Sequence, residues 1–165
     1  MTHDLVFEAL VEYDPGIPGI TVDIELRLGD SSIPVAAKVD TGSDRCIFSR
    51  HYGEKLGLEI ETGEPQRFGT ATGFFLAFGH PITLITGSYS FDSTVYFATE
   101  EAFDRNVLGR FGWLDRVIIG INDYVGNYTS KDTKTNEGNS SNRRHDPYQH
   151  GLLDQTPGAV FHVRH

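Results

Sequence analysis

Apolar residues occupy every second position from Ile20 to Leu28, and this alternation restricts the fold of the chain more than any other feature. Successive side chains of a β-strand point to opposite faces, so the pattern predicts a strand with one buried face. Residues 29–32 follow as a turn, and Ile33 to Val39 forms a second extended run. The sequence therefore predicts a β-hairpin whose second strand ends at residue 40.

Short apolar runs separated by turn residues continue through the rest of the first 125 residues. The chain contains 18 glycines and 11 phenylalanines, which in such runs favour β structure. A short helix is expected from about Arg50 to Leu56, capped by Ser49 and ended by Gly57. Further strands are expected at residues 5–12, 82–86, 94–98 and 116–121. The predicted fold class is mostly β.

The hairpin leads into the tetrapeptide Asp40-Thr41-Gly42-Ser43. Asp and Gly are common in β-turns, so this tetrapeptide by itself is weak evidence for chemistry. Its position between two apolar runs would hold the turn rigidly. Two features follow it in order: a glycine- and aromatic-rich stretch at residues 68–79, and Val107-Leu108-Gly109-Arg110 before a helical turn at residues 111–114. The stretch at 68–79 predicts a hairpin with its tip at residues 70–73.

In this order, the three features resemble the retropepsin-like (retroviral-type) single-domain aspartic protease family. The resemblance extends over residues 20–121. It implies a closed, partly barrel-like acid-protease single lobe with a flap hairpin and one or two short helices. It also implies that residues 1–125 form an aspartic protease domain that hydrolyses peptide bonds.

The resemblance assigns a role to each group of residues. Asp40, Thr41, Gly42 and Ser43 would form the catalytic loop. Thr41 would bond across a dimer axis, Gly42 would let backbone groups approach the carboxylates, and Ser43 would donate a hydrogen bond to Asp40. The flap that binds substrate would contain Thr70, Ala71, Thr72, Gly73 and Phe74. Structural support of the loop would come from Val107, Leu108, Gly109 and Arg110, with Gly109 small enough for a chain crossing.

The resemblance further implies a homodimer. Aspartic proteases use two carboxylates that lie about 3 Å apart and share one proton. This chain has one Asp-Thr-Gly and no Asp-Ser-Gly, so the second aspartate is expected from another copy of the chain. Residues 5–12 and 159–163 are both candidates for the dimer contact. The expected substrate is an extended peptide or protein, and no metal or other cofactor is expected.

Composition restricts the kinds of binding partner and the cellular location that are expected for this chain. The net charge of −9 argues against nucleic acid and against an anionic membrane surface as partners. Cys46 is the only cysteine, which predicts a buried structural thiol and no disulfide within the chain. With no apolar stretch long enough for a membrane span, a cytoplasmic protein is expected. Residues 126–165 are mostly polar and are predicted to form a flexible C-terminal tail.

Two other interpretations of the same residues stay open at this point. The chain would be a retropepsin-like module that binds peptides or dimerises without cleaving, or an unrelated β-barrel in which residues 40–43 are only a turn. A structure with Asp40 far from any symmetry axis and open to solvent would favour the second alternative.

Overall fold

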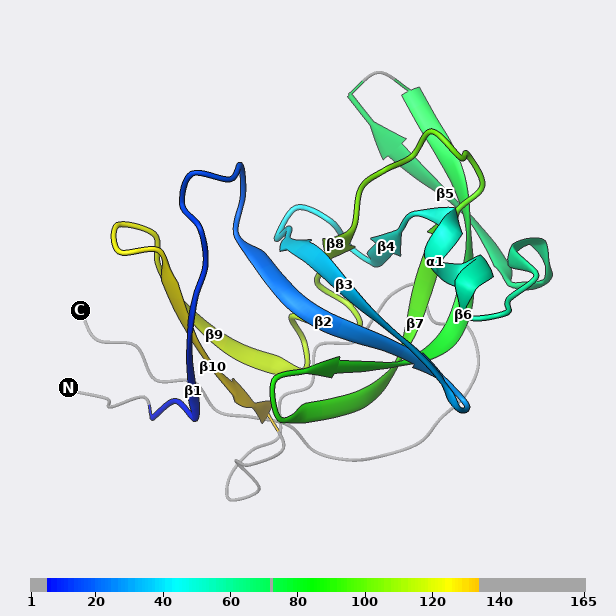
Figure 1. Cartoon of the computed structure of the whole chain (residues 1–165). Coiled ribbons are helices and arrows are strands. Elements are labelled where there is room, and N and C mark those ends of the chain that lie inside the picture. The colour runs from blue at the N-terminus through cyan, green and yellow to red at the C-terminus, as the bar shows by residue number, and fades with distance from the viewer. Residues whose placement is uncertain (1–5, 72, 134–165) are drawn as a thin grey trace, which may run out of the picture.

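The structure, a computed structural model, describes residues 6–71 and 73–133 (Figure 1). Two short helices occur in it, α1 (Arg50–Lys55) and the 3-10 helix η1 (Ile60–Thr62). The strands are β1 (Ala9–Glu12), β2 (Thr21–Leu28), β3 (Ser31–Val39), β4 (Cys46–Phe48), β5 (Glu64–Thr70), β6 (Gly73–Thr86), β7 (Tyr89–Ala98), β8 (Val107–Leu108), β9 (Val117–Asn122) and β10 (Asn127–Asp132). Within the described ranges, no helix combines the length and the apolar character that crossing a bilayer requires.

Most strands belong to one sheet that closes on itself. Its order is β2-β3-β8-β4-β7-β6-β5, and β2 also pairs with β6. The strands from β2 to β6 in this order therefore form a closed six-stranded barrel, while β5 extends from β6 as the other arm of a hairpin (Figure 1). A mostly β fold with a closed, partly barrel-like body is thus confirmed.

The predicted hairpin of alternating residues forms the first part of the barrel. β2 and β3 pair antiparallel from Thr21↔Lys38 to Leu28↔Ser31. Val22, Ile24 and Leu26 are buried, as the alternation requires, and they contact the main core around Phe48 and Trp113. Burial of each such side chain contributes about 1.5–3 kcal/mol to folding.

The short helix begins where the sequence predicts but without the predicted cap. Ser49 occupies the position before α1, and its side chain makes no capping hydrogen bond. Its hydroxyl donates instead to the carbonyl oxygen of Phe103, at 2.6 Å. The serine therefore ties α1 to the segment before β8, a long-range contact that local sequence does not reveal. Gly57, with φ of +86°, follows the helix as expected.

A second, three-stranded sheet has the order β1-β10-β9 (Figure 1). β10 pairs with β9 from Asn127↔Asn122 to Asp132↔Val117, so ordered structure continues beyond the boundary predicted at residue 125. The first residues of the predicted tail are a strand because Tyr128 and Ser130 face the interior, where the Tyr89 hydroxyl donates to the Ser130 carbonyl oxygen. The rest of that tail, including residues 159–163, lies outside the described residues.

The single cysteine is fully buried, as predicted, and we expect its thiol to be inert in the folded protein. Burial raises the pKa of Cys46 from 9.0 to about 12. A thiol reagent at about pH 8 should therefore label Cys46 only after denaturation. Labelling of the native protein at the rate of a free thiol would contradict this.

The same pKa shift predicts a loss of stability at alkaline pH. The unfolded thiol ionises near its ordinary pKa of 9.0, whereas the folded thiol stays protonated up to about 12. Each pH unit between these values should lower the free energy of unfolding by up to about 1.4 kcal/mol. Denaturant titrations between about pH 8 and 10.5 should show this slope reduced in Cys46→Ala. Equal slopes in both proteins would contradict it.

Candidate active site

Asp40 directly follows β3, and backbone hydrogen bonds hold it there. Its N–H donates to the carbonyl oxygen of Leu108 at 3.0 Å, and its carbonyl accepts from the Ser43 N–H at 3.2 Å. The Gly42 N–H donates to the carboxylate oxygen Oδ1 at 2.9 Å. The second carboxylate oxygen has no hydrogen bond to the described residues, and the side chain is exposed. Asp40 therefore offers a carboxylate with one fixed and one open oxygen.

The other residues of the tetrapeptide differ in what they contact. A Cβ on Gly42 would lie 3.2 Å from Oδ1 of Asp40, so a side chain would crowd the carboxylate. Ser43 was expected to bond Asp40, but its hydroxyl donates to the carbonyl oxygen of Arg45 at 2.8 Å. That expectation was wrong because the turn directs Ser43 toward the start of the next strand. The Thr41 side chain is exposed.

The segment of Val107 to Arg110 lies against the Asp40 loop. β8 is inserted between β3 and β4, parallel to β3 and antiparallel to β4. Beyond β8 the chain crosses the backbone of Arg45 so closely that a Cβ on Gly109 would lie 2.2 Å from the Arg45 carbonyl oxygen. The Arg110 N–H donates to the Ser43 carbonyl at 2.9 Å, while its guanidinium lies 3.9 Å from the Asp44 carboxylate. The loop is thus held from both sides.

The glycine- and aromatic-rich stretch forms the predicted hairpin. β5 and β6 pair antiparallel from Glu64↔Gly79 to Thr70↔Gly73, so the tip of the hairpin lies where the sequence places it. Phe68 stacks on Phe75 with ring centroids 5.4 Å apart, and Phe75 approaches Phe103 at 4.8 Å. Phe68 also meets the edge of the buried Tyr96 ring. These rings connect the hairpin to the barrel and to the segment before β8.

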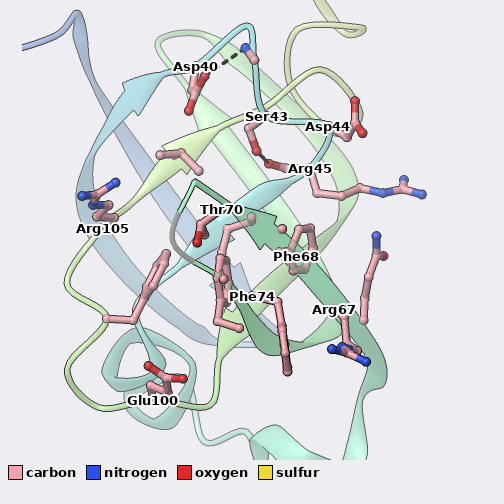
Figure 2. A pocket seen from close by; sticks show the side chains of 18 of the residues that line it. Asp40, Ser43, Asp44, Arg45, Arg67, Phe68, Thr70, Phe74, Glu100 and Arg105 are labelled. Carbon is pink, nitrogen blue, oxygen red and sulfur yellow. Dashed lines mark hydrogen bonds between the residues drawn. The ribbon is translucent and has the colours of Figure 1, made fainter.

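A groove of about 840 Å³ lies between the Asp40 loop, the hairpin and residues 100–107. Figure 2 shows Asp40 on one side and the hairpin residues Thr70 and Phe74 across from it. Apolar side chains that line it include Ile47, Phe68, Phe75, Phe103 and Val107. Of the residues predicted for the site, the groove is lined by Asp40, Gly42, Ser43, Thr70, Gly73, Phe74 and Val107. Thr41, Ala71, Leu108, Gly109 and Arg110 are not among its lining residues, and Thr72 lies outside the described residues.

Sequence reasoning missed several residues of the groove. Residues 100–106 contribute Glu100, Phe103 and Arg105, β5 contributes Arg67, and Arg45 lies directly before β4. Residues 100–106 contain no motif and no regular hydrophobic period. The one available signal was their position immediately before Val107, because whatever precedes β8 must pass beside the end of β3.

Comparison with known proteins finds similarity among solved structures but none in sequence. No protein-family model matches the chain, and no curated protein matches it. Among solved structures, the chain is similar to EIAV protease complexed with the inhibitor HBY-793, with a TM-score of 0.43 and 19% sequence identity. The match covers 55% of this chain and 80% of the other. This similarity assigns neither a family nor an activity.

We expect Gly109→Ala to destabilise the protein by more than about 3 kcal/mol, because the added methyl would overlap backbone atoms that cannot rotate away. Gly69→Ala is the matched control, since nothing lies within 4 Å of its Cβ position. That control should change the free energy of unfolding by less than about 0.5 kcal/mol. Denaturant titration measures both values, and similar values for the two variants would refute the role of the crossing.

Proposed function

We propose that this protein is a retropepsin-like aspartic endopeptidase that is active as a homodimer. The observation that carries the proposal is the setting of Asp40. Its carboxylate is exposed, one oxygen is fixed by the Gly42 N–H, and it lines a groove with aromatic walls. A carboxylate that acts on an amide must be fixed in orientation yet accessible to water and substrate, and Asp40 meets both conditions.

In the proposed mechanism two Asp40 carboxylates share one proton. The ionised carboxylate takes a proton from a water molecule, whose oxygen attacks the peptide carbonyl carbon. The protonated carboxyl group donates its proton to the carbonyl oxygen. Collapse of the resulting tetrahedral intermediate breaks the C–N bond while one carboxyl proton passes to the leaving nitrogen and a hydroxyl proton of the intermediate returns to the ionised carboxylate, which restores the shared proton. No covalent bond to the protein forms.

The second carboxylate is assigned to a second copy of the chain. Asp44, Glu100 and Asp104 also line the groove, but none of them belongs to an Asp-Thr-Gly turn. Asp44 faces the Arg110 guanidinium instead. A twofold axis beside the loop would bring two identical Asp40 side chains together, and the exposure of this side chain in the single chain supports such an arrangement.

The β5–β6 hairpin is proposed as the flap. It forms the wall across from Asp40, and its edge could pair with an extended peptide through backbone hydrogen bonds (Figure 2). Closure would exclude water from the reacting bond. A cytoplasmic location belongs to the same proposal and is supported by the buried free thiol of Cys46, which requires no oxidising compartment.

Replacing Asp40 by Asn should abolish cleavage, with a loss of at least about 10³-fold in kcat/KM, because the amide can neither take nor donate the shared proton. The assay is cleavage of an unstructured protein between about pH 3 and pH 7, with pepstatin as a second inhibition test. Asp44→Asn is the matched control on the same loop. Retained cleavage in Asp40→Asn would refute the proposal. A folded dimer that binds peptides but cleaves none would favour the non-catalytic module.

Mixing wild-type and Asp40→Asn chains tests the dimer directly. With one tenth wild-type chains at constant total concentration, random exchange leaves about one hundredth of the dimers with two aspartates. Activity should therefore fall to about one hundredth of the undiluted value. A monomeric enzyme would instead retain one tenth, in proportion to its wild-type chains.

A further inference from the structure

Most arginines of the described residues have a close interaction partner. Ion pairs with acidic side chains are formed by Arg27, Arg50, Arg110 and Arg116. The buried Arg45 lies over the rings of Tyr96 and Phe111. Within residues 6–71 and 73–133, Arg67 and Arg105 are the two arginines that form no ion pair and lie over no buried ring. Both of them line the groove. Acidic side chains outnumber basic ones by 23 to 14, so partners were not scarce.

Arg67 is held in a fixed orientation without being neutralised. Its guanidinium carbon lies 3.6 Å from the ring centroid of Phe74, on the adjacent strand of the hairpin. The residue opposite Phe74 is Gly69, and nothing lies within 4 Å of its Cβ position. The missing side chain lets Arg67 reach across to Phe74. A stacked guanidinium keeps its N–H groups free at the edge, where they match the two oxygens of a carboxylate.

Arg105 presents a second positive charge from a different wall of the groove. It lies on the segment before β8 and is exposed, and Figure 2 shows it on the opposite side of the hairpin from Arg67. The groove is also lined by the acidic side chains of Asp40, Asp44, Glu100 and Asp104, and within the described residues none of them forms an ion pair with Arg67 or Arg105. Glu100 lies apart from both arginines in Figure 2, and Asp44 faces Arg110. Arg67 and Arg105 therefore have no carboxylate partner in the described residues although acidic side chains line the same groove.

We propose that Arg67, stacked on Phe74, and Arg105 recognise carboxylate groups of the substrate. The inference rests on the proposed function and makes it more specific, because the preferred cleavage sites would be apolar segments that also carry an acidic group. The carboxylate would come from an Asp or Glu side chain or from the free C-terminus of a short peptide. Both sources present the same pair of oxygens to a guanidinium.

Quenched fluorescent peptides of one length test this directly. Each keeps the same apolar centre and carries Glu, Gln or Lys at a single scanned position, with both ends blocked. A further Gln peptide with a free C-terminus separates the terminal carboxylate from the side-chain carboxylate. At one or more positions, kcat/KM for Glu should exceed that for Gln by about 3- to 10-fold, with Lys poorest. The ratio should fall at high salt because charges at an exposed site are screened.

Arginine variants identify which side chain recognises the carboxylate of the peptide. Arg67→Gln and Arg105→Gln should each bring the Glu-to-Gln ratio toward one at the position that the arginine contacts. Arg27→Gln removes the same charge from an ion pair with Glu25 outside the groove lining, and it should keep the ratio. A ratio near one in the wild type, or one that survives both groove variants, would overturn the inference.

Binding of the same peptides to the Asp40→Asn variant separates this inference from the proposed function. Fluorescence anisotropy should show tighter binding of the Glu peptide than of the Gln peptide, and Arg67→Gln in the same background should remove the difference. Charge-selective binding without cleavage by the wild type would contradict the proposed function but not this inference. Cleavage by the wild type, with no preference for the Glu peptide in either assay, would contradict this inference but not the proposed function.

Discussion

The crossing of Gly109 over the backbone of Arg45 is the contact on which the Asp40 loop depends. A methyl group at this position would lie within 3 Å of three backbone atoms of Arg45, so only glycine lets the two segments meet. The meeting allows the Arg110 and Phe111 N–H groups to donate to the carbonyls of Ser43 and Asp44. These bonds, with the one from Asp40 to Leu108, tie both ends of an exposed turn to the barrel. An exposed carboxylate can therefore be fixed in place without being buried.

Aromatic contacts hold the β5–β6 hairpin against the barrel, as backbone hydrogen bonds hold the Asp40 loop. Phe68 and Phe75 stack on the face that meets Tyr96 and Phe103, so the base of the hairpin is anchored in apolar packing. The other face carries Arg67 over Phe74, which is largely exposed. Alternation along two paired strands produces this division, because residues opposite one another share a face. One hairpin thus combines an anchored face with a face free to meet a ligand.

The parts that sequence reasoning predicted are those governed by short-range patterns. The alternation from Ile20 to Leu28 specifies a strand with one buried face, and the glycines around Thr70 specify a turn. The parts it missed depend on contacts between distant segments. The Ser49 hydroxyl bonds to Phe103 rather than capping α1, and Ser43 bonds to Arg45 rather than to Asp40.

The same distinction explains the end of the fold and the missing wall of the groove. β10 has a polar sequence that resembles a tail, and it is a strand because β1 and β9 pair with it on both sides. Residues 100–106 enter the site only because β8 is inserted between β3 and β4. No local pattern encodes either arrangement. Composition gives only the totals of acidic and basic residues, whereas the structure shows which arginines form no ion pair.

The exposure of Asp40 connects the fold to the proposed chemistry. A carboxylate fixed on one oxygen gains nothing for stability from its open oxygen, since an exposed charge is already well solvated by water. The barrel nevertheless devotes a glycine-dependent crossing and several backbone hydrogen bonds to holding this residue in one orientation. Such ordering has a physical purpose where a second group must meet the carboxylate in a defined geometry. If Asp40 acts in a shared-proton pair as proposed, a chain with a single Asp-Thr-Gly would take the second carboxylate from the same residue of another copy.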